Sequence, residues 1–334
     1  MKNLILIFTL LLFISCKSDK NEVTIIQNLG EAFGTTYNIQ YESNTDFHDE
    51  LKKVFGIINQ SMSTYLPDSD ISRINRGDTT VVVDHYFREV FNTSREVWEA
   101  TNGYFDPTVG PLVNAYGFGP SGRLSGIDST QIDSILQFVG FDKLTLSPDL
   151  KLIKQDPRIF IDFNAIAKGY AIDVLGRVLD RNNVENYLIE LGGELLSKGK
   201  NTKTGNPWIV AIDDPTQTEE RTLIKKLKLQ DKALASSGNF RKTRIDPETG
   251  AKYVHSINPK TGWPKKSNVL STSVIAENCM LADAYATVFM VMELEESKAF
   301  LAENNFLEAY IIYLDENKTL QEWMSPGFKA LVVD

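Results

Sequence analysis

The sequence contains few of the side chains that most often serve as nucleophiles, bases and zinc ligands. Its 334 residues include three His and two Cys, and the two Cys are Cys16 and Cys279. A Cys-based zinc site is therefore excluded, and Cys279 has no partner for an intramolecular disulfide if Cys16 is modified. The sequence also lacks a basic run and has a net charge of -9, which argues against nucleic-acid binding and against electrostatic attachment to anionic lipid.

A long apolar run lies at the N-terminus. Residues 1–16 read M-K-N-L-I-L-I-F-T-L-L-L-F-I-S-C, which is typical of a secretory signal peptide and too short for a comfortable membrane span. Its end resembles a lipobox, in which Cys16 receives acyl chains such as palmitate, although Phe13 stands where that motif usually has Leu. An uncleaved anchor, or a plain signal with a stray Cys, is the alternative. We therefore expect a signal peptide over 1–15, a lipidated Cys and tether over 16–22, and an exported domain over 23–334.

Hydrophobic periodicity predicts a mixture of strands and helices. Strands are expected over 23–41, 159–163, 187–191, 208–212, 223–229, 269–276, 309–314 and 329–333, and helices over 47–61, 86–101, 164–180 and 281–292. Segments 61–75 and 103–120 are predicted as loops, because the first lacks periodicity and the second is rich in Gly, Pro and aromatics. Gly117, Gly119 and Gly122 spell a dinucleotide-binding fingerprint, but no apolar strand precedes it and no helix follows, so a Rossmann site is rejected.

The segment Leu281 to Met292 organises the candidate site, because it is predicted as a buried helix without Gly or Pro. Asp283 and Thr287 stand four residues apart, so their carboxylate and hydroxyl lie on one helix face. Two oxygen ligands one turn apart suit Mg²⁺, which is commonly held by few protein groups together with substrate phosphates. A capping Asp with a Thr bonded to its own turn is the alternative that this segment alone leaves open.

A second candidate region joins the predicted strand over 159–163 to the helix after it. Asp162 falls just before this helix, and Lys168 lies in its first turns. A helix N-terminus favours anions, and a Lys there adds a point charge for phosphate. A capping Asp beside a solvated Lys fits the same residues, so both interpretations stay open at this point.

His255 is the histidine that lies among site-like segments, within Y-V-H-S-I-N-P-K-T-G-W-P. It follows an alternating strand pattern, so its ring points to the face opposite that of its neighbours. An imidazole in such a place is a candidate proton acceptor, and a His hydrogen-bonded at a strand end is the competing interpretation. His48 and His85 lie in polar surroundings and are predicted as surface residues.

Eight motifs, taken in order, carry a resemblance to a known family. They read G-T-T-Y (34–37), S-T-Y-L-P-D-S-D-I-S-R-I-N (63–75), F-D-P-T-V-G-P-L-V-N-A-Y-G-F-G (105–119), D-F-N-A-I-A-K-G-Y-A-I-D (162–173), L-G-G-E (191–194), A-S-S-G-N-F (235–240), H-S-I-N-P-K-T-G (255–262) and A-D-A-Y-A-T (282–287). Together they resemble the ApbE family of FAD:protein FMN transferases over residues 25–333.

The resemblance implies an α+β fold of two interlocked sheet-and-helix lobes with FAD in the cleft between them. It also implies a bacterial cell-envelope enzyme, lipid-anchored to a membrane and facing the periplasm. Such an enzyme splits FAD in a Mg²⁺-dependent step, attaches FMN through a phosphoester to a Thr or Ser of a target protein, and releases AMP. The implied acceptors are subunits of membrane redox complexes, such as the Na⁺-translocating NADH:quinone reductase or Rnf type.

The resemblance also assigns site residues. Asp283 and Thr287 match the family's metal-binding helix, and Ala165 matches the position whose backbone carbonyl completes the metal site. Met280 stands where some members have a further Asp, so water is expected to replace one ligand. Phe33 stands where many members have Met. The residues that match FAD contacts are Phe33, Tyr65, Tyr104, Phe105, Asp106, Asp162, Lys168 and Ile257.

The chemistry needs charge stabilisation at the phosphates and a base for the incoming hydroxyl. Mg²⁺ and Lys168 suit the first task. His255 is the first choice for the base and Asp162 the second, while Tyr65 offers a flat face for the flavin ring. Two other functions stay open: hydrolysis of FAD to FMN and AMP, and storage or delivery of FAD by a non-catalytic flavin-binding lipoprotein.

Overall fold

The computed structural model describes residues 24–120, 122–214, 223–239, 243–245, 248, 250, 252–264 and 268–333. The predicted signal peptide, Cys16 and the tether lie outside these residues. Among the described helices, none combines the length and the apolar character that crossing a membrane requires.

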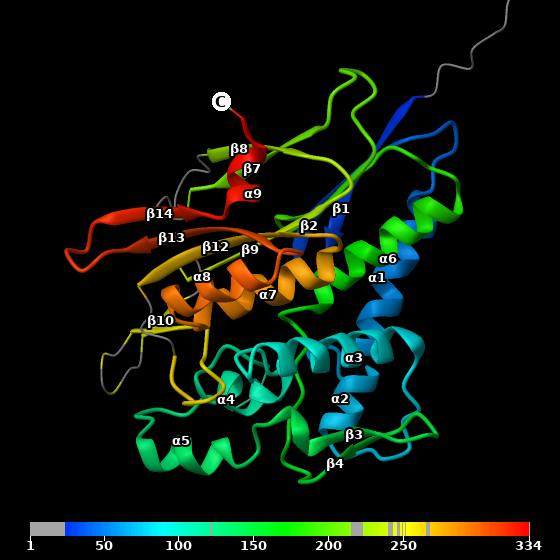
Figure 1. Ribbon diagram of the computed structural model, residues 1–334. Helices are drawn as coiled ribbons and strands as arrows, with labels where there is room; N and C mark the ends of the chain where they lie inside the picture. The colour runs from blue at the N-terminus through cyan, green and yellow to red at the C-terminus, as the bar shows by residue number, and fades with distance from the viewer. Residues whose placement is uncertain are drawn as a thin grey trace, which may run out of the picture.

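The chain is built around one eight-stranded sheet whose neighbouring strands all run antiparallel (Figure 1). In spatial order the strands are β1 (Ile25–Ala32), β2 (Thr35–Glu42), β5 (Tyr187–Leu191), β6 (Glu194–Lys198), β9 (Ala233–Gly238), β12 (Val269–Ala276), β13 (Glu308–Leu314) and β14 (Leu320–Met324). A large antiparallel sheet combined with separate helices is the α+β class that was predicted.

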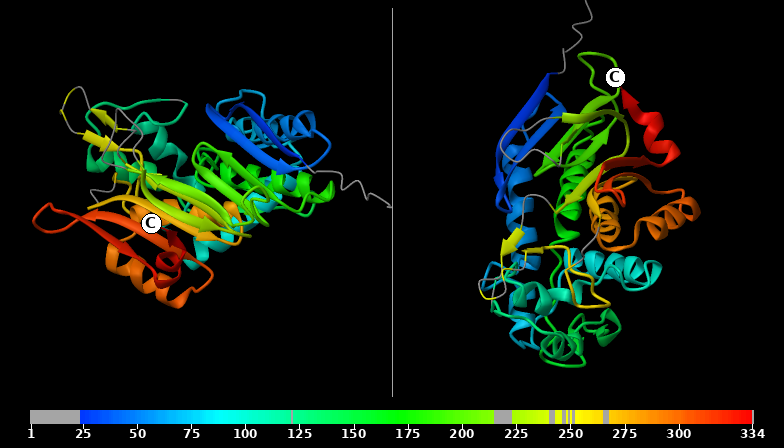
Figure 2. Two further views of the ribbon diagram at one scale, coloured as in Figure 1. Left: turned by 90° about the horizontal axis from the view of Figure 1, so that it is seen from above. Right: turned by 90° about the vertical axis from the view of Figure 1, so that its left-hand side faces the viewer.

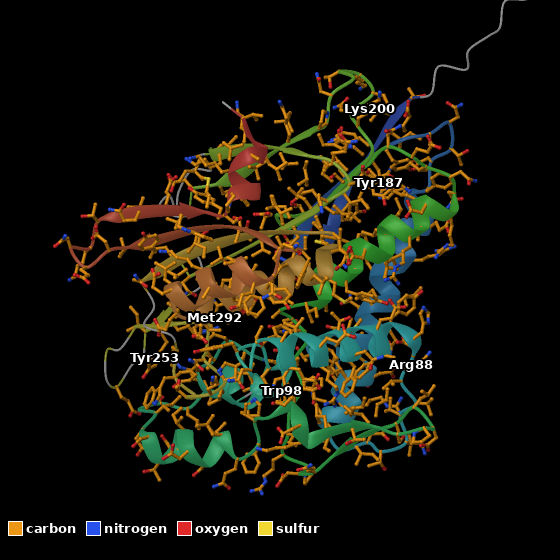
Figure 3. The ribbon with its side chains drawn as sticks, viewed as in Figure 1. Arg88, Trp98, Tyr187, Lys200, Tyr253 and Met292 are labelled. Carbon is orange, nitrogen blue, oxygen red and sulfur yellow. The ribbon has the colours of Figure 1, made fainter. Side chains whose placement is uncertain are left out.

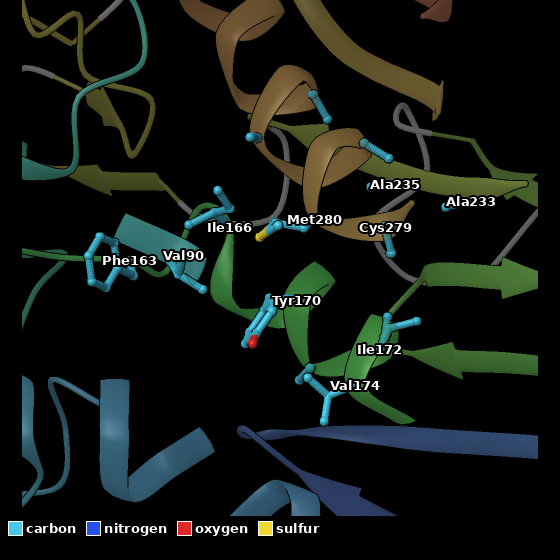
Figure 4. Packing of buried hydrophobic residues seen from close by; sticks show 14 of the residues in the cluster. Val90, Phe163, Ile166, Tyr170, Ile172, Val174, Ala233, Ala235, Cys279 and Met280 are labelled. Atoms are coloured by element: carbon cyan, nitrogen blue, oxygen red, sulfur yellow. The ribbon is translucent and has the colours of Figure 1, made fainter. Parts of the chain in front are cut away.

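One face of the sheet is covered by helices α1 (His48–Met62), α6 (Ala167–Arg181) and α7 (Cys279–Val291), and α8 (Leu294–Glu303) follows α7. Figure 4 shows Tyr170 and Ile172 of α6 close to Cys279 and Met280 of α7, with Ala233 and Ala235 of β9 behind them. Helix α7 is buried on nearly every side, as its apolar sequence predicted. The candidate site therefore lies on the most deeply packed helix of the fold.

The other face of the sheet carries a smaller layer (Figure 2). It consists of β7 (Trp208–Asp213), β8 (Leu223–Leu229), β15 (Val332–Val333) and α9 (Pro326–Leu331). Residues 329–333 were predicted as a strand that closes the main sheet, and this prediction is wrong. Pro326 starts a short helix instead, and β15 pairs with β8 in the smaller sheet.

The remaining elements form a mainly helical part beneath α6 and α7. They are α2 (Asp70–Asn75), α3 (His85–Ala100), η1 (Pro107–Val109), α4 (Gly110–Ala115), α5 (Ser129–Leu136), η2 (Phe141–Lys143), β3 (Leu144–Leu146), β4 (Leu152–Lys154), β10 (Thr243–Ile245) and β11 (Lys252–Val254). Figure 3 places Trp98 of α3 and Tyr253 of β11 in this part. The rejected glycine fingerprint follows α4 rather than a strand, so no dinucleotide-binding turn forms there.

The segment 61–75, predicted as a loop, ends in a helix. Ser69 accepts a hydrogen bond from the N–H of Ser72 at 3.2 Å and thereby caps α2. At six residues, α2 is too short for hydrophobic periodicity to reveal it.

The segment 103–120, predicted as irregular, contains η1 and α4. Asp106 caps η1, and both helices carry a Pro in their first turn. The N–H groups in the first turn of a helix have no acceptor within the helix. Pro, which has no N–H, can therefore stand there without the loss of a helical hydrogen bond. The prolines that suggested irregular structure therefore mark helix starts.

Residues 159–163 were predicted as a buried strand, but they belong to no sheet in the described structure. The Asn75 side chain takes the place of a neighbouring strand. Its Nδ2 donates to the carbonyl of Ile161 at 2.9 Å, and its Oδ1 accepts from the N–H of Ile161 at 2.8 Å. The alternation correctly predicted which side chains are buried, Ile159, Ile161 and Phe163, but an apolar pattern does not reveal the pairing partner.

Two tight turns lie side by side at one end of the sheet. Phe33 and Gly34 join β1 to β2 with φ of 51° and 74°, and Gly192 and Gly193 join β5 to β6 with φ of 63° and 102°. The N–H of Gly192 donates to the carbonyl of Thr36 at 3.0 Å, which holds the two turns together. The positive φ at three of these positions is the reason why Gly occupies them.

Candidate active site

Asp283 lies where α6 and α7 cross. Its side chain is buried, and its Oδ2 accepts a hydrogen bond from the N–H of Gly169 at 3.0 Å. Gly169 is required at this crossing, since an added Cβ would lie 2.3 Å from the carbonyl oxygen of Cys279 and 2.8 Å from the Cβ of Asp283. The first turn of α6 and the first turns of α7 are thereby held in direct contact.

Lys168 faces the same region and is paired with a residue that the sequence did not single out. Its Nζ lies 2.6 Å from Oε2 of Glu194, the first residue of β6. The side chain of Glu194 is 5% exposed and that of Lys168 is 29% exposed. We refer to Lys168, Glu194 and Asp283 as the charged cluster.

The charged cluster holds two carboxyl groups and one ammonium, and its pKa shifts reflect this imbalance. Burial raises the pKa of Glu194 and of Asp283, and the Lys168 charge only partly opposes this. Burial alone would lower the pKa of Lys168, but Glu194 and Asp283 raise it overall. The Lys168 ammonium therefore stays charged, and the two carboxyl groups of the charged cluster can balance one further positive charge.

The start of α7 is held by a second buried carboxylate, Asp173, which lies one turn after Gly169 on α6. Its two oxygens accept hydrogen bonds from the N–H groups of Cys279 and Met280, each at 2.8 Å. Burial raises the pKa of Asp173 to about 7. Asp173 and Gly169 together fix the position of α7 along α6, and this also fixes the position of Asp283.

The residues at this crossing fit a divalent cation. Asp283 supplies a buried carboxylate oxygen, Thr287 follows one turn later, and Ala165 lies in the turn that leads into α6. No group of three or more His, Cys, Asp or Glu side chains in the described ranges could hold a metal ion. A hard cation would therefore depend on hydroxyl, carbonyl and phosphate oxygens besides Asp283, which is the donor set that Mg²⁺ accepts.

Tyr65 lies at a surface cavity of about 330 Å³, which is lined by Thr64, Tyr65, Pro67, Ser72, Asn75, Arg76, Pro120 and Phe160. Asp162 is not part of this lining, but it lies close enough to Tyr65 for its charge to act on the Tyr65 hydroxyl. Asp162 is buried and accepts a hydrogen bond from the N–H of Asn164 at 2.7 Å. Burial raises the pKa of Asp162. The Tyr65 side chain is 61% exposed, and partial burial and the Asp162 charge raise its pKa. The ring is thus available to a ligand.

Two of the residues that match FAD contacts are interior packing groups. Phe105 is 3% exposed in the main core, and Ile257 is 6% exposed in a smaller core beneath α4 and α5. Little of either residue is therefore exposed to a ligand in this structure.

Tyr104 and Asp106 have partners of their own. The Tyr104 hydroxyl donates to Oε2 of Glu296 in α8 at 2.9 Å, and Nζ of Lys260 lies 4.4 Å from the centre of the Tyr104 ring. The Asp106 carboxylate accepts hydrogen bonds from Thr108 and from the N–H of Phe141. Their part in binding FAD stays a prediction.

Phe33 occupies the first of the two turns described above. Its ring packs edge to face against Phe55 of α1, with 5.6 Å between ring centres. The turn lies at the same end of the sheet as Glu194, so Phe33 borders the side of the fold that carries the charged cluster.

His255 follows β11, and its ring packs edge to face against Phe118, with 6.2 Å between ring centres. The next residue, Ser256, donates to Oδ1 of Asn239 at 2.7 Å, which joins this segment to the end of β9. Of the other histidines, His85 is exposed as predicted. His48 is not a plain surface residue, because its Nε2 lies 2.8 Å from the Tyr37 hydroxyl and its side chain is half-buried.

Sequence reasoning missed Glu194, Asp173 and Asn75 as contributors to the site. Each stood inside a quoted motif, where it was taken as part of a turn, a helix or a loop. One signal was present for Asp173, since a carboxylate among the apolar residues of a predicted helix must find a buried partner. Glu194 and Asn75 act through residues far away in the sequence, and no local pattern reveals such partners.

Comparison with known families identifies the group to which this arrangement belongs. A family model described as the ApbE family matches residues 33–311. The chain belongs to the ApbE family.

Relatives in the ApbE family match this chain over nearly its whole length. The chain is 34% identical to the FAD:protein FMN transferase of Haemophilus influenzae, covering 95% of this chain and 94% of the relative. It is 33% identical to the protein of the same name from Vibrio cholerae, covering 98% of each.

Solved structures of ApbE proteins share the fold. The flavin transferase ApbE from Vibrio cholerae superposes with a TM-score of 0.82 at 32% identity, covering 92% of this chain and 99% of that chain. The apo form of the Pseudomonas stutzeri flavinyl transferase ApbE superposes with a TM-score of 0.79 at 26% identity, covering 93% and 99%. The mixed fold of sheet and helices is therefore that of the ApbE flavin transferases.

Proposed function

We propose that the chain transfers FMN from FAD to a Thr or Ser hydroxyl of a target protein and releases AMP. The observation that carries this proposal is the charged cluster. Two buried carboxyl groups share one ammonium beside the N-terminus of α6, where a pyrophosphate and a cation can be bound together. The near full-length similarity to proteins named FAD:protein FMN transferase supports it.

Within this proposal, Asp283, Thr287 and the Ala165 carbonyl would hold Mg²⁺. When bound, Mg²⁺ supplies positive charge for the non-bridging phosphate oxygens. Lys168 adds a point charge for the same oxygens, and the positive end of the α6 dipole favours an anion there. Tyr65 offers its exposed ring to the flavin.

In the proposed step, the acceptor hydroxyl oxygen attacks the phosphorus atom on the FMN side of the pyrophosphate. A new P–O bond forms to the acceptor, the P–O bond to the bridging oxygen breaks, and its electron pair leaves with AMP. His255 takes the hydroxyl proton, since an imidazole can serve as a base near neutral pH. Asp162, whose pKa burial raises, is the second candidate for this role.

We further propose that the domain is exported and held at a bacterial membrane by acyl chains on Cys16, facing the periplasm. The N-terminal sequence supports this location. The acceptors would then be subunits of membrane redox complexes of the Na⁺-translocating NADH:quinone reductase or Rnf type.

The proposed function is tested by incubating the protein with FAD, Mg²⁺ and a candidate acceptor, followed by mass measurement of the acceptor. Transfer adds the mass of FMN minus water to the acceptor and forms AMP in equal amount. Formation of free FMN and AMP with an unmodified acceptor would instead identify an FAD hydrolase. Binding of FAD without turnover would identify a carrier.

The matched control for this assay is Asp283→Asn, which keeps the side-chain shape but removes the charge that offsets Mg²⁺. We expect transfer to collapse while FAD binding survives in part through the flavin ring. Full turnover by this variant, or by the wild type in EDTA, would show that the metal assignment is wrong.

A further inference from the structure

Glu194 is placed to control Lys168, the residue proposed to hold the pyrophosphate. It is the first residue of β6 and directly follows the Gly192–Gly193 turn, so a rigid hairpin fixes its backbone. Its carboxylate is nearly inaccessible to solvent, whereas Lys168 keeps 29% of its side chain exposed. Glu194 therefore pairs with the ammonium from the interior, and a ligand that reaches the exposed part of Lys168 must compete with this ion pair.

The charges of the cluster favour a cation more than an anion. Two buried carboxyl groups face one ammonium, and Glu194 forms the ion pair with it, with 2.6 Å between its Oε2 and the Nζ of Lys168. A pyrophosphate that approached Lys168 without a cation would have to compete with the Glu194 carboxylate for the ammonium. A divalent cation would add positive charge beside the same two carboxyl groups.

We propose that Glu194 is a positioning residue that withholds the Lys168 ammonium from pyrophosphate until Mg²⁺ is bound. This inference rests on the proposed function, because it takes FAD as the ligand. Glu194 thus makes FAD binding depend on the metal, and it prevents FAD from occupying a site that lacks the metal needed for transfer.

The test is Glu194→Gln in the full chain, because Gln has nearly the same size but no charge. FAD affinity is measured by fluorescence titration in EDTA and again in Mg²⁺, at pH 8.5, which is above the pKa of about 8 to which burial raises Glu194. In EDTA the variant should bind FAD about tenfold more tightly than the wild type, because the Lys168 ammonium has lost the carboxylate that competes with the pyrophosphate for it. The Mg²⁺ concentration that half-saturates FAD binding should rise.

The matched control is Glu190→Gln, in the same hairpin. Glu190 accepts a hydrogen bond from the N–H of Gly193 at 2.8 Å and lies on β5, four residues before Glu194. Glu190→Gln removes one negative charge outside the charged cluster, so FAD affinity in EDTA should not change. A purely structural role for Glu194 predicts weaker FAD binding with and without Mg²⁺, and either that result or an unchanged affinity in EDTA would overturn the proposal.

A double variant shows whether the effect passes through Lys168. If Glu194 acts by holding the ammonium, the gain from Glu194→Gln in EDTA should disappear in the presence of Lys168→Gln. If Glu194→Gln still increases FAD affinity when Lys168→Gln is also present, Glu194 does not act through Lys168 and the proposal is wrong. If Glu194→Gln does not fold, Glu194→Asp takes its place, because its shorter side chain draws the charge away from Lys168 and should give a smaller gain of the same sign.

These measurements separate the inference from the proposed function. Metal-dependent FAD binding that responds to Glu194→Gln, without transfer to any acceptor, would support the inference and contradict the function. Absence of FAD binding under all conditions would contradict both.

Discussion

His255 is the first candidate for the base that accepts the hydroxyl proton. If its ring accepts the hydroxyl proton, His255→Asn should lower the transfer rate by about 10²- to 10⁴-fold with little change in FAD affinity. The wild-type rate should fall as the pH drops through the ring's pKa, because the protonated ring cannot act as a base. The Asn variant should lose this acid limb. Rates measured against FAD concentration at several pH values test both expectations.

A suitable control for this substitution is His85→Asn. His85 is exposed, and its ring lies against Tyr86 at the start of α3, with 3.7 Å between ring centres. The control should behave like the wild type. A His255→Asn variant that binds FAD poorly but turns over normally at saturating FAD, with its acid limb intact, would instead assign the base role to Asp162.

At the scale of helices and strands, the crossing of α6 and α7 is the contact most sensitive to a single methyl group. Gly169→Ala places a Cβ against the carbonyl oxygen of Cys279, so the helices must separate. We expect the free energy of unfolding to fall by about 1–3 kcal/mol and FMN transfer to fall with it, because Asp283 moves with α7. Urea unfolding and the mass assay measure the two effects.

Gly56→Ala on α1 is the matched control, since an added Cβ there meets nothing within 4 Å. Replacing an exposed helical Gly by Ala should raise the free energy of unfolding by up to about 1 kcal/mol and leave transfer unchanged. Equal stability of the two variants would mean that the close contact at Gly169 is not a constraint.

Elements with their own periodicity could be predicted from the sequence, and elements defined by distant partners could not. Helix α7 was predicted to within two residues at each end, because a buried apolar helix needs no knowledge of its neighbours. Residues 159–163 had the pattern of a buried strand, yet their hydrogen bonds go to the Asn75 side chain, 86 residues away from Ile161. Short capped helices such as α2 carry too few residues for periodicity to show.

The same distinction applies to the site. Asp283 and Thr287 could be placed on one face of a helix, because spacing along a helix is local information. The partner of Lys168 could not be predicted, since Glu194 reaches it only through the hairpin of β5 and β6. Gly192 and Gly193 were correctly predicted to form a tight turn, but the sequence did not indicate that this turn brings Glu194 close to Lys168.

For the molecule as a whole, buried carboxyl groups decide how stability depends on pH. Burial raises the pKa of Asp106, Asp162, Asp173, Glu194 and Asp283. Between about pH 4 and about pH 8 the folded protein holds protons that the unfolded chain has released, so the free energy of unfolding should fall as pH rises across this range. Thermal melting in EDTA at pH 5, 6, 7 and 8 should give steadily lower midpoints.

If Asp283 holds Mg²⁺ as proposed, the metal should reduce this loss of stability, because protons and the metal would compete for the same carboxylate. Its effect on the melting midpoint should therefore be larger at pH 8 than at pH 5. A midpoint that rises with pH in EDTA, or a Mg²⁺ effect that is larger at pH 5, would contradict this account.

The proposed anchor can be tested on the whole protein. Cys16→Ser cannot carry the lipid, so the variant should appear in a soluble exported fraction or accumulate as uncleaved precursor. Transfer by the domain from residue 21 onward should be unaffected in solution. Fractionation with lipid labelling is the measurement, and an unlipidated, soluble wild-type protein would refute the anchor.

If Cys16 carries the proposed anchor, the eight-residue strands β1 and β2 would also act as a spacer between the membrane and the reaction. The chain enters the sheet at Thr24, whose carbonyl accepts from the N–H of Ser43, and Tyr187 and Lys200 lie near this end (Figure 3). Glu194 and the Phe33–Gly34 turn lie at the opposite end, about 25 Å away at the rise of an extended strand. If the proposed anchor holds the entry end toward the bilayer, an acceptor hydroxyl would have to lie well above the lipid surface to be modified. Such an anchor would favour target subunits that carry their acceptor residue on a domain projecting from the membrane over those that carry it at the bilayer surface.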